Sequence, residues 1–142
     1  MKNLIRIEEL GQFVLVLFIL VGAQMPWWVF LLLLLGPDIG MLGYLMNPGV
    51  GAVTYNVFHH KGVAVVLILM GQIARYSIAF DATFGDVDEV MFIVGVILYG
   101  HASMDRIFGY GLKFGDNFHH THLGWIGKGQ AVGAEREAGQ GQ

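Results

Sequence analysis

Long apolar runs constrain this sequence more than any other feature. They cover residues 10–23, 26–46, 62–80 and 87–108 of the 142. A helix needs about 20 residues to cross the hydrocarbon core of a bilayer. The last three runs are long enough, and the first becomes so if residues 4–9 join it. The pattern predicts an all-α fold, a polytopic bundle of about four transmembrane helices.

The composition favours a membrane location and excludes several kinds of site. Hydrophobic residues make up 55% of the chain and charged residues 13%, whereas an average soluble domain carries roughly 25% charged residues. The 21 glycines suit close helix packing in lipid, because small side chains let two backbones approach. The lack of cysteine excludes disulfides and thiolate metal ligands. The net charge of −3 gives no indication of a nucleic-acid partner. The lack of a Gly-rich phosphate loop likewise gives no indication of a nucleotide cofactor.

The lysines and arginines set the predicted orientation, because cytoplasmic loops collect these residues. Four spans with an inward N-terminus place seven of the eight inside and only Arg75 outside. If residues 10–35 formed one span, the resulting three spans would divide the same residues five to three. Four spans with both termini in the cytoplasm therefore fit better. Removal of the first run as a signal peptide would also leave three spans, and this alternative stays open.

The chain divides into one transmembrane domain and a tail. Residues 1–126 hold all the apolar runs, and we expect them to form the four-helix transmembrane domain. Residues 127–142 have no apolar periodicity and predict a disordered cytoplasmic tail. Between the second and third spans, Asn47 suits a helix N-cap and Pro48 a first helical position. We expect a helix there that runs into the third span or lies along the membrane surface.

Ionisable side chains inside an apolar bundle are costly, and they mark functional sites. In the predicted topology they gather towards the cytoplasmic face. The candidate metal ligands are carboxylates and imidazoles: Asp38, His59, His60, His101, Asp105 and His122. Imidazole and carboxylate together suit zinc, iron or manganese. Arg106 and Lys113 are the candidate substrate-binding residues, since a cation there could neutralise a phosphate group.

The spacing of these residues narrows the set. His101 and Asp105 are four residues apart, so they share one face of a helix. His59 and His60 point about 100° apart on a helix, so only one of them can face the bundle. Asn56 is three residues before His59 and four before His60, so we expect it to line the same helix face.

A structural interpretation of the same residues competes with the metal site. His101 and Asp105 could form a hydrogen-bonded pair that joins two helices. Asp38 follows Pro37 and could cap a helix break, with Arg106 as its counter-ion. His122 would then be a loop residue near the lipid headgroups.

Several motifs in the same order resemble a known family. They are PDIGMLGYL (37–45), YNVFHH (55–60), HASMDRIFGYGLKF (101–114) and THLG (121–124). They closely resemble the DUF 4260 family, small bacterial membrane proteins that share a domain of unknown function, and the resemblance runs over residues 7–127. It implies an uncleaved four-helix, multi-pass protein of the bacterial cytoplasmic (inner) membrane. It also highlights a subset of the polar residues: Asp38, His101, Asp105, Arg106 and His122.

A looser likeness is to the membrane-bound metal-dependent hydrolases. Pro37–Asp38, a histidine before a later span, and the H-x-x-x-D of residues 101–105 follow their order. Gly40 stands where those proteins have a second aspartate. The chain also reads HHKG at 59–62 where they carry an HRGxTHS-like segment.

Three functions compete at this point. The first is a metal-dependent hydrolase that acts at the cytoplasmic lipid interface and uses a divalent metal. The second is a non-enzymatic accessory subunit or lipid-binding module, in a homo-oligomer or a larger membrane complex. Small residues such as Gly36 and Gly40 could form its contact with a partner helix. The third is transport of a proton or metal ion along intramembrane Asp and His groups.

Overall fold

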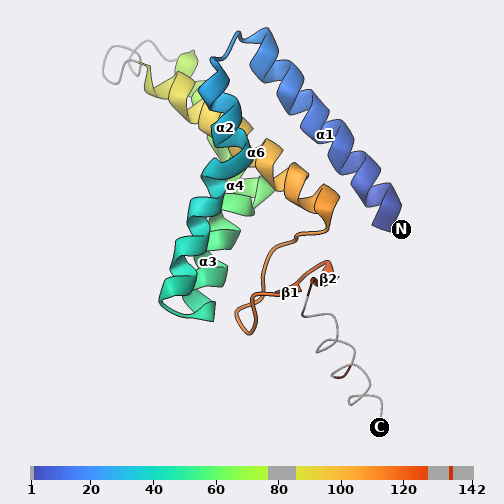
Figure 1. The fold of residues 1–142 in the computed structure, drawn as a ribbon. Coiled ribbons are helices and arrows are strands. Elements are labelled where there is room, and N and C mark those ends of the chain that lie inside the picture. The colour runs from blue at the N-terminus through green and yellow to red at the C-terminus, as the bar shows by residue number, and fades with distance from the viewer. Residues whose placement is uncertain (1, 77–85, 128–134, 136–142) are drawn as a thin grey trace.

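The computed structural model describes residues 2–76, 86–127 and 135, and almost all of them that form regular structure are helical (Figure 1). In chain order the elements are α1 (Lys2–Gly22), α2 (Trp27–Leu35), the 3-10 helix η1 (Gly36–Leu45), α3 (Pro48–His59), α4 (Lys61–Arg75), α6 (Val87–Phe108), β1 (His120–Thr121) and β2 (Gly124–Trp125). The two strands pair antiparallel in a small hairpin. The all-α prediction is therefore confirmed, apart from this hairpin in a segment that we had expected to be a loop.

Helix α6 lies at the centre of the bundle. It packs against α4 and α1 over most of its length and also touches α2 and α3 (Figure 1). Helices α2 and η1 run in one direction, and α3 turns back beside η1. α3 then leads into α4 across His60, with a bend of 44°. The α3–α4 bend therefore lies beside η1 and α6.

Glycines set the close approach of neighbouring helices. A side chain at Gly40 would lie 3.0 Å from the Thr54 carbonyl oxygen and 3.2 Å from the Cα atom of Tyr55. A second aspartate, as in the membrane hydrolases, therefore does not fit at position 40. The predicted contact of Gly36 and Gly40 with a partner helix is also wrong for Gly40, because α3 of the same chain covers it.

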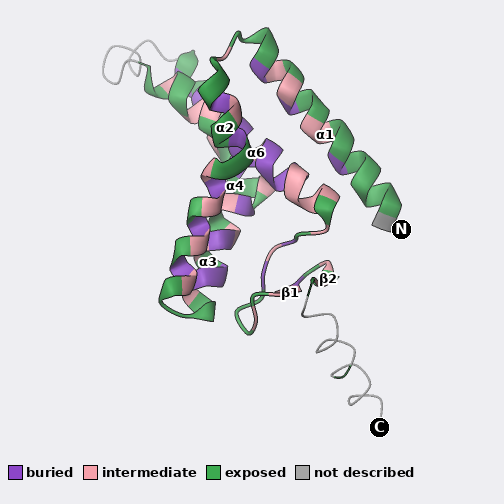
Figure 2. Cartoon of the chain, in the orientation of Figure 1, coloured by how far each residue is buried: buried purple, intermediate pink, exposed green. Residues whose placement is uncertain are grey.

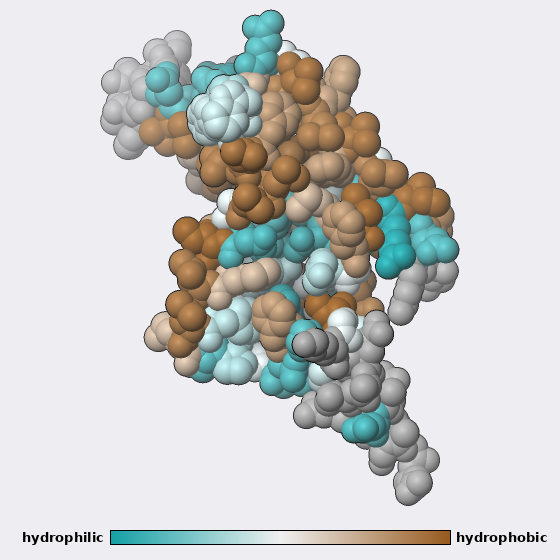
Figure 3. All heavy atoms as spheres, viewed as in Figure 1, coloured by the Kyte–Doolittle hydropathy of each residue, from teal (hydrophilic) through white to brown (hydrophobic). Residues whose placement is uncertain are grey.

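The packed core lies between α1, α2 and α6. Its buried residues are all aliphatic: Val16, Leu20, Val29, Leu33, Val96 and Ile97. Figure 2 shows buried positions along the inner helix faces and exposed positions over much of α1. Large apolar side chains remain exposed on every helix, and they cover much of the upper half of the molecule in Figure 3. An apolar surface of this extent marks contact with a membrane or a partner.

Two helical segments, Trp27–Leu45 and Val87–Phe108, are long and apolar enough to cross a membrane. The bent pair of α3 and α4 would be a third if it acts as one span. α1 has the length, but its first half carries Arg6, Glu8 and Glu9. The four-span prediction is thus confirmed only in part.

Local predictions around α3 are confirmed. The Asn47 side chain accepts a hydrogen bond of 2.8 Å from the Val50 amide, and Pro48 is the first helical residue. The predicted tail, 127–142, falls almost entirely outside the described residues and stays a prediction.

Candidate functional site

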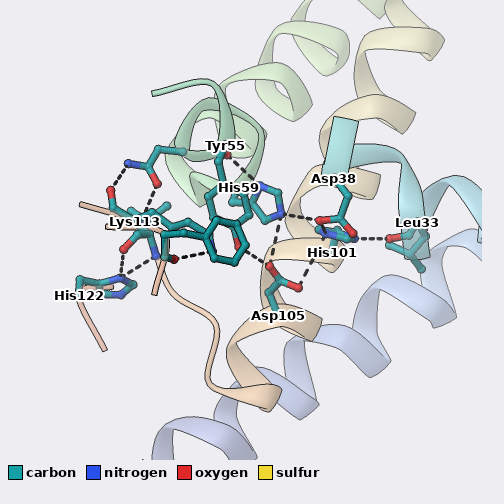
Figure 4. A network of polar contacts seen from close by, with 11 residues as sticks. Leu33, Asp38, Tyr55, His59, His101, Asp105, Lys113 and His122 are labelled. Carbon is teal, nitrogen blue, oxygen red and sulfur yellow. Dashed lines mark hydrogen bonds and ion pairs between the residues drawn. The ribbon is translucent and has the colours of Figure 1, made fainter. Parts of the chain in front are cut away.

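Four side chains that are far apart in the sequence converge inside the bundle (Figure 4). Asp38 comes from η1, His59 from the last residue of α3, and His101 and Asp105 from one face of α6. Asp38 Oδ1 lies 3.6 Å from His59 Nε2 and 3.5 Å from His101 Nε2. The metal-binding atoms of Asp38, His59 and His101 all lie within 4.8 Å of one another.

Backbone carbonyls fix the orientation of both imidazoles. His59 Nδ1 lies 2.8 Å from the Tyr55 carbonyl oxygen, and His101 Nδ1 lies 2.9 Å from that of Leu33. A carbonyl oxygen can only accept, so each Nδ1 carries the proton and donates it. In this tautomer each ring presents a lone pair on Nε2, the atom that faces Asp38. This is the arrangement in which histidines bind metals.

The acceptor for His101 is a consequence of Pro37. In a helix the Leu33 carbonyl would accept the amide four residues later, but proline has no N–H. The Gly36 amide makes the ordinary helical bond to the Leu32 carbonyl, so it does not occupy the Leu33 carbonyl either. The Leu33 oxygen is thus free for the imidazole of His101, and Asp38 follows directly in η1. A 3-10 run of ten residues is unusually long, and such runs often mark functional positions.

The two Nε2 atoms are buried, and neither has a hydrogen-bond partner among the described residues. Their separations from Asp38 exceed a direct hydrogen bond. They are instead close to the edge of a tetrahedron around zinc, which is about 3.3 Å for metal–ligand bonds of 2.0–2.1 Å. The donor set therefore fits a divalent metal better than a hydrogen-bonded network.

Asp105 completes the cluster, and Tyr55 holds it in place. Asp105 Oδ2 accepts a hydrogen bond of 2.6 Å from the Tyr55 hydroxyl and lies 3.3 Å from His59 Nε2. Its Oδ1 lies 3.9 Å from His101 Nε2, too far for the hydrogen-bonded pair of the structural interpretation. The Tyr55 ring stacks on His59, with ring centroids 3.7 Å apart. Asp105 can therefore act as a fourth ligand or as a base beside the metal.

Access to the cluster is from one side. The side chains of His101 and His59 are 0% and 3% exposed, and that of Asp105 is 15% exposed. Asp38, at 38%, is the most open of the four. A ligand from outside therefore reaches the cluster on the Asp38 side.

The segment after α6 closes the cluster from behind. Asn56 exchanges two hydrogen bonds with the backbone of Lys113, at 2.7 and 2.8 Å. The Lys113 ammonium donates to the Phe118 carbonyl and lies 3.4 Å from the centroid of the Phe118 ring. It also lies 4.8 Å from the Tyr55 ring centroid. Lys113 is buried, so it supplies positive charge near the carboxylates rather than an open contact for substrate.

The burial of Lys113 predicts a pH-dependent stability. Burial lowers its pKa from 10.5 to about 8, because the charged ammonium loses water. Between these pH values the unfolded chain binds more protons than the folded one, so the free energy of unfolding should rise with pH. Unfolding of the wild type and of Lys113→Met, compared in detergent from pH 7 to pH 10.5, should show a steeper rise in the wild type, because the variant lacks the contribution of Lys113. Equal pH dependence in both proteins would contradict it.

Other candidate residues lie outside the cluster. His60 is exposed and caps α4 by accepting the Gly62 amide. His122 is exposed, and its Nδ1 accepts the Leu112 amide at 2.8 Å. Figure 4 places it on the far side of Lys113 from Asp38. The prediction that only one of His59 and His60 faces the bundle is confirmed.

Arg106 belongs to a separate polar group. Its Nη1 lies 3.4 Å from Glu9 Oε1, so its counter-ion is Glu9 and not Asp38. Lys61 donates to the same buried Glu9 and to Gln12. Sequence reasoning missed this group and also missed Tyr55. The position of Tyr55, four residues before His59 and on the same helix face, was the available signal.

Comparison with known proteins identifies the chain at the level of a family. A family model described as "Domain of unknown function (DUF4260)" matches residues 2–126. No curated protein and no solved structure matches the chain. The function therefore has to be argued from the geometry of the site.

Proposed function

Because the chain belongs to the DUF4260 family, whose description assigns no activity, we propose its function from the His/Asp cluster. We infer that the protein is a metal-dependent membrane hydrolase. Asp38, His59 and His101 hold one divalent metal, and Asp105 lies beside it as a base or a fourth ligand. The resemblance to membrane-bound metal-dependent hydrolases supports the same reaction class only by analogy.

The pair of buried Nε2 atoms carries this proposal. Both are directed at one carboxylate oxygen, and both Nδ1 atoms are already committed to backbone carbonyls. Leaving a buried polar atom unsatisfied costs about 1–3 kcal/mol. A metal between them would satisfy both atoms at once.

The chemistry follows from the donor set. Two imidazoles and one carboxylate, with a position left for water, are the ligands of a catalytic zinc site. A bound metal lowers the pKa of its water to about 7 and so provides a nucleophile. Tyr55 holds Asp105 through Oδ2. Asp105 Oδ1, on the His101 side, can take the proton from the attacking water and return it to the leaving group.

The membrane setting defines the class of substrate. We place four spans in a bacterial inner membrane, with α1, α2–η1, α3–α4 and α6 alternating in direction and both termini in the cytoplasm. The exposed Trp27 and Trp28 support this, because tryptophans favour the membrane interface. Two exposed apolar residues of η1, Ile39 and Leu42, follow Asp38 within about one helical turn. We therefore expect an ester or phosphoester that partitions into the membrane.

Asp105→Asn is the test of the hydrolytic role. Elemental analysis should still find zinc in the purified variant, because the other three ligands remain. Hydrolysis of a panel of nitrophenyl carboxylate and phosphate esters should fall by about 10²–10⁴, the usual contribution of a general base. His60→Ala is the matched control, since His60 is exposed outside the cluster, and its rate should equal that of the wild type.

Two outcomes would contradict the hydrolase. One is an unchanged rate in Asp105→Asn. The other is wild-type protein that carries iron and hydrolyses no ester, because a 2-His-1-carboxylate iron site performs oxygen chemistry instead.

The alternative functions have less support. Gly40 packs within the chain, which weakens the glycine pair as the contact of an accessory subunit. Ion transport needs polar groups distributed across the membrane. The four cluster residues instead meet at one point in the bundle.

A further inference from the structure

A second cavity lies apart from the metal cluster. It has a volume of about 220 Å³ and lies between the first half of α1, the end of α6 and the β1–β2 hairpin. Arg6 and Arg106 line it, together with Phe108, Trp125 and Ile126. None of the cluster residues contributes to it, so its role is independent of the metal.

The cavity carries an excess of positive charge. Arg6 forms no hydrogen bond or ion pair with any residue in the described ranges. Arg106 uses Nη1 towards Glu9, which is also paired with Lys61. No described residue lining the cavity is acidic. Two guanidinium groups therefore face one small space with most of their donors available.

The surroundings of the cavity are apolar and open to the outside. Phe108 and Tyr110 lie at its edge and are both exposed. On α1, Leu4 and Ile7 are exposed on either side of the lining residue Ile5. The chain leaves α6 at Gly109, whose positive φ of 89° turns it towards the hairpin. A polar ligand in the cavity would thus be bordered by apolar surface.

We propose that this cavity binds the phosphate group of an anionic membrane lipid. Planar guanidinium forks match phosphate oxygens, and two of them favour a headgroup with net negative charge. The volume is below the roughly 300–1,000 Å³ of a pocket for a drug-sized ligand, so it admits a headgroup but not a whole lipid. The acyl chains would follow the exposed apolar side chains of α1. Basic pockets of this kind at the cytoplasmic side of membrane helices bind anionic headgroups.

Lipid binding to the full chain in detergent tests this assignment. Native mass spectrometry should show one phosphatidylglycerol retained by the wild type, and no comparable retention of diacylglycerol with the same chains. Arg6→Gln should weaken phosphatidylglycerol binding by about tenfold or more, because it removes charged hydrogen bonds. Arg6 has no partner among the residues that the structure describes, so we expect this variant to fold normally.

Arg75→Gln is the matched control, because Arg75 is an exposed arginine whose partner is Asp88, away from the cavity. It should bind phosphatidylglycerol as the wild type does. Equal binding by Arg6→Gln and the wild type, or equal retention of diacylglycerol, would overturn the proposal. If inorganic phosphate alone raised the unfolding temperature as much as phosphatidylglycerol, the ligand would be free phosphate and the lipid assignment would be wrong. Metal content should be unchanged in Arg6→Gln, so this test and that of the metal site can fail separately.

Discussion

Replacing His101 with alanine is expected to remove nearly all of the metal from the purified protein. His101 is fully buried, and its Nε2 is one of only two imidazole ligands of the proposed site. Even loss of an outer partner of a metal ligand typically costs 10–100-fold in affinity, and loss of the ligand itself should cost more. Elemental analysis of protein purified without chelator should find about one zinc per chain in the wild type. It should find almost none in His101→Ala.

The controls separate loss of a ligand from loss of the fold. His122→Ala removes an exposed imidazole outside the cluster and should keep the metal of the wild type. A chelator should lower the unfolding temperature of the wild type, since a ligand that binds only the folded state stabilises it. The chelator should leave the unfolding temperatures of His101→Ala and His101→Gln unchanged. Wild-type protein without metal, or full metal occupancy in His101→Ala, would show that the cluster is structural.

Gly95→Ala is expected to destabilise the protein by about 1–3 kcal/mol, the usual cost of overpacking a tight contact. A methyl group at Gly95 would lie 2.7 Å from the Ala64 carbonyl oxygen and 2.8 Å from the Ile68 amide nitrogen. Both are backbone atoms of α4, so the helix itself must move away from α6. Unfolding in a titration from mild detergent to sodium dodecyl sulfate, followed by circular dichroism, measures the change.

Gly11→Ala provides the opposite expectation for the same substitution. Gly11 lies within α1, and nothing lies within 4 Å of the position of an added methyl group. Alanine in a helix interior is more stable than glycine by roughly 0.5–1 kcal/mol. The change in the free energy of unfolding should therefore have opposite signs in the two variants. If Gly95→Ala were as stable as Gly11→Ala, the α4–α6 contact would be looser than the structure has it.

Much of the helical layout could be predicted from local chemistry. Asn47 and Pro48 begin α3 because a side-chain acceptor and a residue without N–H suit a helix start. His101 and Asp105 share a face because they are one turn apart. The spans were harder to count, because the charges in α1 and the bend at His60 interrupt the apolar pattern.

The partners of the polar residues could not be predicted. The structural interpretation pairs Arg106 with Asp38, but Arg106 lies beside Glu9, which is 97 positions away in the sequence. His122 is close to Asp105 in sequence, yet the hairpin directs it to the Leu112 amide. The positive charge of Lys113 suggests a substrate-binding role, but the side chain is buried beside Tyr55. Two hydrogen bonds between the Asn56 side chain and the Lys113 backbone hold it there. Each of these outcomes depends on contacts between distant segments.

The apolar helices, their local starts and breaks, and the supply of His and Asp side chains all follow from local sequence. These features depend on a residue and its neighbours within one or two helical turns. Pro37 is the furthest-reaching example, since its missing N–H frees the Leu33 carbonyl. That His101 uses this carbonyl and directs its Nε2 towards Asp38 and His59 depends on tertiary packing. That arrangement requires η1, α3 and α6 to pack at one point, and glycine contacts between distant segments, rather than local pattern, set how closely they approach.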